Sequence, residues 1–305
     1  MISALVFGSR GLLGSEIVSI LKSNSTTAAL AIPSISWENG ELADAQIRSH
    51  VHALLASEDS VKEIFWCAGV ATQRSEGSEV IDEQQRLRSV IQTIRDFRSR
   101  AEIHKLRIFF ASSAGGVYGD TGSRLATESE APKPLDPYGV SKLKLERLLT
   151  AFCEEFEARL TIGRLSSLYG ERQNLTKAQG LLSHLAMSIA SSRPLNIFTS
   201  LSSTRNYLDA RTAARISVMQ TRIDDPAVVR TRNICSPYNV SVAELVSLGR
   251  LLSGGGLRIL QTGSAEPSNS RIATSFSDEV TAFTRSTLAE GLSSLVAHAR
   301  RELMR

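Results

Sequence analysis

Short apolar runs alternate with amphipathic stretches through the first half of the chain. The apolar runs predict strands at 2–7, 28–32, 63–67, 106–111 and 160–165. Between them, apolar residues recur every three or four positions and predict helices at 12–21, 43–56, 79–100 and 138–157. This alternation is typical of a parallel sheet with helices on both faces, so we predict an α/β fold with a doubly wound sheet.

The regular alternation of predicted strands and helices ends after Gly170. In this part we expect a helix over 175–192, a strand pair at 196–198 and 206–208, a strand at 229–234, and a helix from Ser241. The segments 253–256 and 262–270 are rich in glycine or polar residues, which predicts loops.

The first predicted strand breaks directly into a glycine-rich turn, Gly8-Ser-Arg-Gly11-Leu-Leu-Gly14. Gly8 allows a tight turn, Gly11 lets a pyrophosphate approach the main chain, and Gly14 lets the next helix lie close on the strand. The helix N-terminus adds free N–H groups and a partial positive charge. The pattern predicts a dinucleotide cofactor, although a strand–turn–helix corner that needs glycine only for its shape has the same spacing.

A tyrosine and a lysine four residues apart open the predicted helix at 138–157. This spacing places the Tyr138 phenol and the Lys142 ammonium on one helical face, where the cation favours the phenolate and eases proton transfer. The strand at 106–111 ends in Ser112 and Ser113, at the edge where open α/β sheets bind ligands. Serines there also serve simply to satisfy backbone groups. Together with the glycine turn, these groups predict a hydride-transfer site.

Several further motifs accompany this constellation: Val117-Tyr118-Gly119, Arg164 with Leu168-Tyr169-Gly170, Arg205-Asn-Tyr-Leu-Asp209 and Thr287-Leu-Ala-Glu-Gly-Leu292. With them the chain resembles the extended short-chain dehydrogenase/reductases, in the branch of nucleotide-sugar epimerases, dehydratases and reductases. The resemblance implies hydride exchange between a nicotinamide and a sugar carbon, usually C4. Tyr138 would be the acid/base, and Lys142 would hold the nicotinamide ribose.

The resemblance also implies a domain organisation. We expect an NAD(P)-binding Rossmann domain at 1–168, rejoined by about 204–236. A smaller C-terminal α/β region, made of 169–203 and 237–305, would bind the substrate, a nucleotide-diphosphate sugar.

Site residues follow from the same resemblance. The expected cofactor contacts are Gly8, Ser9, Arg10, Gly11, Leu12, Leu13, Gly14, Cys67, Ala68, Gly69, Tyr138, Lys142 and Leu165. The expected substrate contacts are Ser112, Ser113, Ser167, Arg205 and Arg271. The two arginines would bind the diphosphate through paired hydrogen bonds, and a solvated surface position is an equal alternative for Arg271.

Three departures from the family pattern bear on the chemistry. Counting back from Val117 puts the family's catalytic hydroxyl on Ala114, whereas the distance to Tyr138 favours Ser113, with Ser112 in reserve. Two glycines, 115 and 116, replace the acidic pair of the dehydratases, so dehydration is not expected. Ser167 stands where family members have an asparagine.

The choice of coenzyme depends on the end of the second strand. Its window, Ile32-Pro-Ser-Ile-Ser36, lacks the acid that binds the adenine-ribose 2′-OH in NAD sites. Arg10 lies inside the glycine turn, where a guanidinium can bind a 2′-phosphate, so we favour NADP(H) over NAD(H). The segment up to Asp44 looks most like GDP-fucose synthase and other reductases that use NADPH. We therefore expect a 4-keto-sugar reductase, with a 4-epimerase as the alternative and a non-catalytic NADP-sensing protein as a distant third.

Composition and charge disfavour other classes of protein. A formal charge of +4 is modest for 305 residues, and the basic residues are scattered, so nucleic acid is not an expected partner. No segment has the length and apolarity of a membrane span or the pattern of a cleaved leader. Cys67, Cys153 and Cys235 lack paired spacing, which favours a reduced, cytoplasmic protein.

Two further expectations concern metals and assembly. His50 and His52 lie two apart on a predicted helix and face different ways, so no metal site is expected. The resemblance implies a homodimer through the helices at 79–100 and 138–157. The apolar stripe of the first of these, which includes Leu87 and Ile94, is equally explained by core packing.

Overall fold

The computed structural model describes residues 1–69, 78–97, 103–175, 180–262, 266–284 and 287–304. Its main sheet consists of β1 (Ile2–Phe7), β2 (Thr27–Ala31), β3 (Val61–Trp66), β4 (Leu106–Ser113), β5 (Arg159–Leu165) and β9 (Val229–Ile234). These strands are all parallel and lie in the order β2-β1-β3-β4-β5-β9. The strands predicted in the first half are therefore confirmed, with ends that differ by one or two residues.

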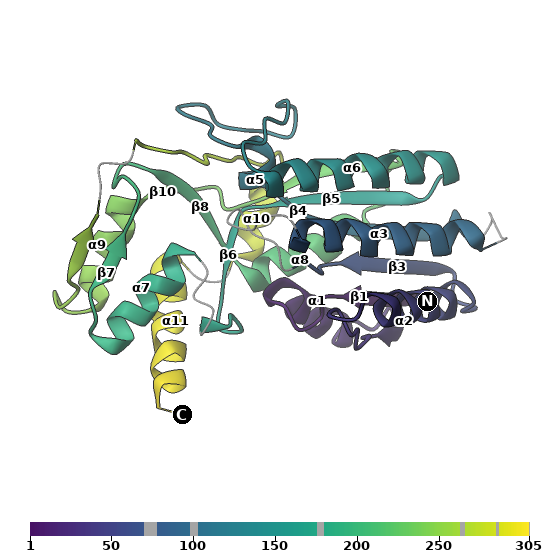
Figure 1. The fold of residues 1–305 in the computed structure, drawn as a ribbon, viewed down its shortest axis with the longest axis horizontal. Coiled ribbons are helices and arrows are strands. Elements are labelled where there is room, and N and C mark those ends of the chain that lie inside the picture. Colours follow the sequence, from purple (N-terminus) through teal and green to yellow (C-terminus); the bar gives the residue numbers. More distant parts are fainter. Residues whose placement is uncertain (70–77, 98–102, 176–179, 263–265, 285–286, 305) are drawn as a thin grey trace.

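Helices cover both faces of this sheet (Figure 1). One face carries α2 (Gly40–Leu55), α3 (Ser78–Asp96) and α6 (Pro137–Phe156), and the other carries α1 (Leu12–Lys22) and α8 (Ala210–Arg222). Successive side chains of β1 enter opposite cores: Leu5 packs in the core under α2, α3 and α6, and Val6 packs in the core under α1 and α8. This is the predicted doubly wound α/β fold. Both faces are buried, which is why the strands are apolar almost throughout.

The apolar stripe of α3 lies inside the protomer. Leu87, Val90 and Ile94 are at most 2% exposed and belong to the core cluster that α3 shares with α2 and α6. Core packing therefore explains the stripe, and the homodimer stays a prediction. The helix expected at 79–100 ends at Asp96 in the structure, and residues 98–100 lie outside the described residues.

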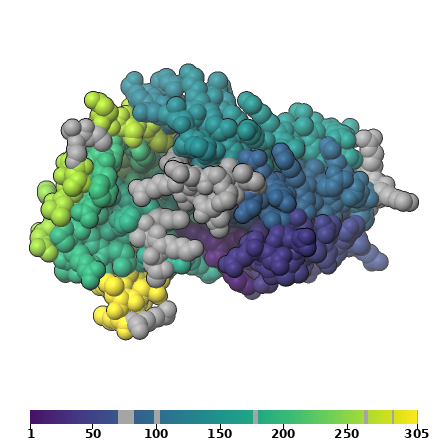
Figure 2. All heavy atoms as spheres, viewed as in Figure 1, coloured from purple at the N-terminus to yellow at the C-terminus, as the bar shows by residue number. Residues whose placement is uncertain are grey.

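A smaller region is interleaved with the last strand of the main sheet, since part of it precedes β9 in the chain and part follows it. It contains β6 (Ser167–Tyr169), β8 (Thr204–Asp209) and β10 (Asn239–Ser241) in one sheet, and β7 (Leu195–Ile197) with β11 (Ile259–Gln261) in another. Its helices are α7 (Leu181–Ser191), α9 (Val242–Leu252) and α11 (Leu288–Leu303), while the short α10 (Ser277–Phe283) packs against α8. In the space-filling view, the N-terminal half and this region occupy opposite ends of the molecule (Figure 2).

Two predictions for this region need correction. The strands expected near 196–198 and 206–208 exist but do not pair: β7 pairs with β11, and β8 pairs with β6 and β10. Their true partners are three-residue strands, too short to leave a periodic pattern in the sequence. The helix expected over 175–192 begins at Leu181, and residues 176–179 lie outside the described residues.

No helix in the described part of the chain combines the length and apolarity needed to cross a membrane. The 20-residue helix α6, which follows β4 and α5, is amphipathic and buries Leu145, Leu149 and Phe152 in the core.

A close backbone contact sets where α6 begins. After β4 the chain forms a short helix, α5 (Ala114–Tyr118), whose Gly116 faces Gly139 in the first turn of α6. A Cβ atom on Gly139 would lie 2.1 Å from the carbonyl oxygen of Gly116. The two helices therefore approach as closely as their backbones allow only because neither residue has a side chain.

We expect Gly139→Ala to lower the free energy of unfolding by about 1–3 kcal/mol, since the new methyl group would force α5 and α6 apart. This loss outweighs the roughly 1 kcal/mol by which alanine favours a helix over glycine. Urea unfolding measures the difference. Gly170→Ala is the control, because a Cβ there meets its nearest neighbour at 3.6 Å; equal losses in the two variants would contradict the proposed steric cause.

Candidate active site

In the turn between β1 and α1, which we call the glycine cradle (Gly8–Gly14), backbone segments approach one another closely. Gly8 has a φ of +76°, and a Cβ atom there would lie 2.4 Å from the carbonyl oxygen of Cys67, at the end of β3. A Cβ atom on Gly14 would lie 2.2 Å from the oxygen of Gly8. The N-cap residue, Gly11, offers no side-chain hydrogen bond to the first turn of α1. The helix N-terminus is thus left to an outside acceptor, and the cradle fits the diphosphate of a dinucleotide.

A small pocket of about 210 Å³ opens beside this cradle, at the carboxyl ends of β3, β4 and β5. The lining residues are Leu13, Cys67, Ala68, Gly69, Ala111, Ser112, Ser113, Tyr138, Lys142, Leu165, Ser166 and Leu168. The fold thus brings together the three predicted catalytic residues and several of the predicted cofactor contacts, although they come from five separate parts of the sequence.

The first turn of α6 presents the tyrosine and lysine. Asp136 caps the helix by accepting a hydrogen bond from the backbone N–H of Gly139 at 2.6 Å. Tyr138 is half-buried, and its ring lies 5.7 Å from the Lys142 Nζ. The pair therefore lies on one helical face, as the spacing predicts.

Lys142 is buried and has a partner that the sequence analysis missed. Its Nζ donates to Oε1 of Glu83 at 2.5 Å and to the carbonyl oxygen of Ala111 at 3.3 Å. Burial acts to lower the pKa of Lys142, but the carboxylate of Glu83, together with the phenol of Tyr138 and the thiol of Cys67, outweighs it and the pKa lies above its ordinary value. One signal for Glu83 was present in the sequence: it stands four residues before Leu87, on the buried stripe of α3, where a charged side chain needs a partner.

The two serines after β4 face different surroundings. Ser112 is buried, and its hydroxyl donates to Oε1 of Glu146 at 2.5 Å. Ser113 is half-buried, and its Oγ accepts the N–H of Gly116 at 3.2 Å as the N-cap of α5. Ala114 is fully buried. Ser113 therefore keeps its O–H proton to offer to the pocket, whereas Ser112 donates its own to Glu146.

A buried network lies behind the serines. Arg164 binds Glu146 through Nη2 at 2.7 Å and donates from Nη1 to the hydroxyl of Tyr118 at 2.9 Å. Burial acts to lower the pKa of Arg164, but the hydrogen bonds that it donates to Glu146 and the charges of Glu146 and Tyr118 raise it above its ordinary value. Tyr118 in turn donates to Oδ1 of Asn233 on β9 at 2.9 Å. This chain of bonds ties β5, α5, α6 and β9 together beneath the pocket.

The remaining predicted substrate contacts lie elsewhere. Ser167 is exposed on β6, and its neighbour Ser166 lines the pocket instead, with a buried Oγ that has no hydrogen-bond partner in the described residues. Arg205 donates to the carbonyl oxygen of Ser268 at 2.6 Å, and Arg271 donates to that of Ser123 at 3.2 Å. Neither arginine lines the small pocket, and their contact with a diphosphate stays a prediction.

Arg10 extends from the glycine cradle towards the end of β2. It is exposed, and its Nη2 donates to Oγ of Ser34 at 2.9 Å. Ser34 follows β2 within the window that lacks an acidic residue. The expected adenosine end of the cradle is therefore edged by a guanidinium and a hydroxyl.

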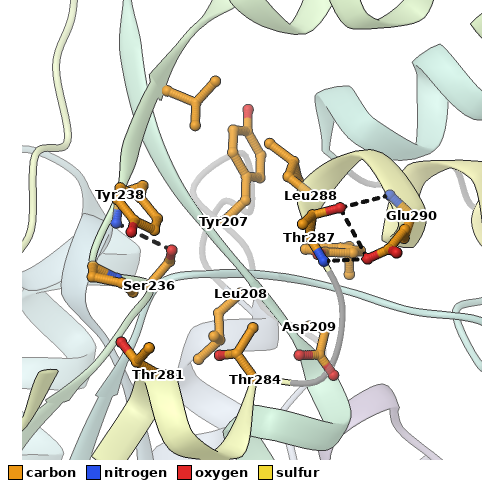
Figure 3. A pocket seen from close by; sticks show the side chains of 13 residues that line it. Tyr207, Leu208, Asp209, Ser236, Tyr238, Thr281, Thr284, Thr287, Leu288 and Glu290 are labelled. Carbon is orange, nitrogen blue, oxygen red and sulfur yellow. Dashed lines mark hydrogen bonds between the residues drawn. The ribbon is translucent and has the colours of Figure 1, made fainter. Parts of the chain in front are cut away.

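A larger cavity of about 450 Å³ lies away from this chemistry (Figure 3). It is bounded by β8, α10 and the start of α11. On β6, Tyr169 lines this cavity, and its neighbour Leu168 lines the small pocket. The cavity has two lining carboxylates, and both stabilise helix N-termini: Asp209 caps α8, and Glu290 belongs to the capping box of α11. None of its described lining residues is basic.

Among the described residues, no three histidine, cysteine, aspartate or glutamate side chains form a group that could hold a metal ion. The thiol of Cys67 lines the small pocket, and burial raises its pKa to about 12, so it stays protonated near neutral pH.

A doubly wound parallel sheet, a glycine cradle and a Tyr/Lys pair at the carboxyl edge are typical of NAD(P)-dependent enzymes with a Rossmann fold. The sequence model of the NAD dependent epimerase/dehydratase family matches residues 4–235. The chain belongs to this family and is an NAD(P)-dependent enzyme of the extended short-chain dehydrogenase/reductase type.

Two relatives illustrate the range of the family. A Methanocaldococcus jannaschii protein, provisionally named a UDP-glucose 4-epimerase, is 25% identical over 255 residues, which is 80% of each chain. An Escherichia coli dTDP-4-dehydro-6-deoxyglucose reductase is 33% identical over 102 residues, about a third of each chain.

Solved structures share the whole fold. UDP-glucose 4-epimerase of Thermotoga maritima, determined with UDP-glucose, has a TM-score of 0.80 at 20% identity and covers 99% of this chain and 100% of its own. RMD from Pseudomonas aeruginosa, determined with NADPH, has a TM-score of 0.78 at 17% identity, with 98% of each chain covered. At these identities the likeness shows the fold alone.

We expect Ser112→Ala to lower the free energy of unfolding by about 1–3 kcal/mol, because the buried Glu146 carboxylate loses a hydrogen-bond donor. Urea unfolding measures the loss. Ser113→Ala is the matched control: its half-buried hydroxyl caps only a five-residue helix, and a smaller loss is expected. A larger loss in Ser113→Ala than in Ser112→Ala would overturn this division of roles.

Proposed function

We propose that this enzyme is an NADPH-dependent reductase that transfers hydride to C4 of a nucleotide-diphospho 4-keto sugar. The observation that carries the proposal is the Arg10–Ser34 pair at the end of β2, in a window without a carboxylate. A guanidinium and a hydroxyl suit a 2′-phosphate, whereas NAD sites place an acid there. A coenzyme that enters reduced and leaves oxidised in each turnover fits a reductase.

The chain's own groups fit the binding of such a coenzyme. The glycine cradle and the uncapped N-terminus of α1 would hold the diphosphate. Lys142 would hold hydroxyls of the nicotinamide ribose, since Glu83 and Ala111 accept only two of the three donors of its ammonium. When bound, the reduced nicotinamide supplies the hydride.

Proton transfer falls to Tyr138. As C4 of the substrate gains a hydride, its carbonyl oxygen takes the phenolic proton, so one O–H bond breaks at Tyr138 and one forms on the sugar. Ser113 donates a hydrogen bond to the same oxygen and helps to stabilise its developing charge. The phenolate regains its proton from solvent before the next turnover.

A 4-epimerase is the second candidate, favoured by the names of the M. jannaschii relative and the T. maritima structure. An epimerase would use the same residues in both directions and return the hydride to the same sugar carbon. The nucleotide sugars named with the solved structures support a substrate of this class, and Arg205 stays our candidate for contact with its diphosphate.

The decisive measurement is the stoichiometry of the coenzyme. We expect NADPH oxidation, followed at 340 nm, to match product formation on a panel of nucleotide 4-keto sugars. Isomerisation of a nucleotide sugar without net loss of NADPH would support the epimerase and refute the reductase.

In the same assay, we expect Tyr138→Phe to lower kcat by roughly 10²–10⁴-fold, the usual worth of a positioned proton donor. Isothermal titration should show coenzyme affinity within about threefold of the wild type, because the phenol is not expected to bind the diphosphate. Unchanged kcat in Tyr138→Phe would remove Tyr138 from the mechanism.

Replacement of Arg10 tests the coenzyme preference. We expect Arg10→Ala to raise KM for NADPH roughly 10- to 100-fold, the worth of charge-assisted hydrogen bonds to a phosphate, and to change KM for NADH little. Arg250→Ala on the exposed face of α9 is the control for general charge effects. Equal changes for both coenzymes would mean that Arg10 does not read the 2′-phosphate.

A further inference from the structure

A buried carboxylate from α3, a helix far from α6 in the sequence, reaches the active site. Glu83 belongs to α3, and its side chain is only 5% exposed. Oε1 accepts the 2.5 Å hydrogen bond of Lys142, and Oε2 lies against Gly69 at the rim of the small pocket. A Cβ atom on Gly69 would lie 2.9 Å from Oε2, so the rim is shaped around the carboxylate.

The turn of α3 that carries Glu83 is held from both sides. Gln84 donates to the hydroxyl of Ser141 on α6 at 2.8 Å. Arg86 binds Asp44 of α2 at 2.7 Å and the carbonyl oxygen of Gly40 at 2.8 Å. Because both neighbouring helices fix this turn, the carboxylate has little freedom to leave Lys142.

Lys142 is the only ionised partner that the described residues offer to Glu83 in the pocket. The other titratable group that faces the ammonium besides Tyr138 is Cys67, whose buried thiol is neutral near pH 7. The next charges, Glu146 and Arg164, bind each other at 2.7 Å behind Ser112 and largely cancel. Glu83 and Lys142 therefore set the local charge that Tyr138 experiences.

We propose that Glu83 is a positioning residue that fixes the Lys142 ammonium for the coenzyme and offsets its charge, so that Tyr138 enters the reaction as a phenol. The inference rests on the proposed reduction, in which Tyr138 must begin each turnover protonated. An unpaired ammonium beside the ring would favour the phenolate, the form that cannot donate. The carboxylate restores the balance and leaves one ammonium donor for the ribose.

The charge effect is measured in the protein without coenzyme or substrate. Tyrosinate absorbance near 295 nm is titrated in Lys142→Met and in Lys142→Met/Glu83→Gln, and matching Tyr138→Phe variants isolate Tyr138 from the other four tyrosines. Both backgrounds lack the lysine cation, so the comparison reports the field of Glu83 alone. We expect the Tyr138 step to occur at lower pH when Glu83 is replaced, because a nearby negative charge opposes ionisation.

The positioning effect is measured by isothermal titration of NADPH into proteins that retain Lys142. We expect Glu83→Gln to weaken binding about tenfold and Glu83→Asp, which keeps the charge, to recover part of the loss. Gln84→Ala is the matched control on the same turn, since it removes a neutral contact to α6, and it should change affinity less than twofold.

The outcomes are separable. An unmoved tyrosinate step on replacing Glu83 overturns the charge role, and equal NADPH affinities for Glu83→Gln and Gln84→Ala overturn the positioning role. If Lys142→Met does not fold, as judged by circular dichroism, Lys142→Gln provides the same comparison. A reductase assay that fails on every sugar, with both Glu83 effects present, would refute the proposed function and leave the contact of Glu83 with Lys142 and Tyr138 established.

Discussion

The contact between Gly116 and Gly139 is the constraint on which the active site depends. The ring of Tyr138 packs on Gly116, where an added Cβ would meet two of its carbon atoms at 3.0 Å. Since Gly116 is held by the Ser113 cap, this one crossing sets the distance between the serine and the tyrosine. Lys142 follows one helical turn later and falls against the end of β4. A bulkier residue at either glycine would displace all three groups together.

Most of the parallel sheet could be predicted from the sequence because its strands are buried on both faces. Runs such as Ile2–Phe7 are almost wholly apolar, whereas an amphipathic helix mixes apolar and polar residues with a period of three or four. Tyr138 and Lys142 could likewise be recognised, because their spacing puts them on one face of any α-helix. Local geometry fixes these features, so no knowledge of distant parts of the chain is needed.

What the sequence hid depends on long-range pairing. The partners of β7 and β8 are strands of three residues, which carry no period, so their pairing follows from packing alone. Ser167, the expected substrate contact, is exposed on β6, and its neighbour Ser166 lines the small pocket, an arrangement that depends on how the chain turns between β5 and β6. Glu83 was missed because its partner stands 59 positions later in the chain.

Two buried ion pairs lie at the pocket, Lys142 with Glu83 and Arg164 with Glu146. A buried pair contributes little net stability compared with apolar residues of similar volume, because both charges lose their hydration. Stability alone is therefore a weak reason for this sequence to hold four charges in its interior. Their geometry offers a better one: each carboxylate fixes a cation that faces a phenol, Tyr138 in the pocket and Tyr118 behind it. The pair of Arg164 and Glu146, with Tyr118, anchors α5 and α6 to the sheet. The pair of Lys142 and Glu83 lies nearer the pocket and meets the reacting groups.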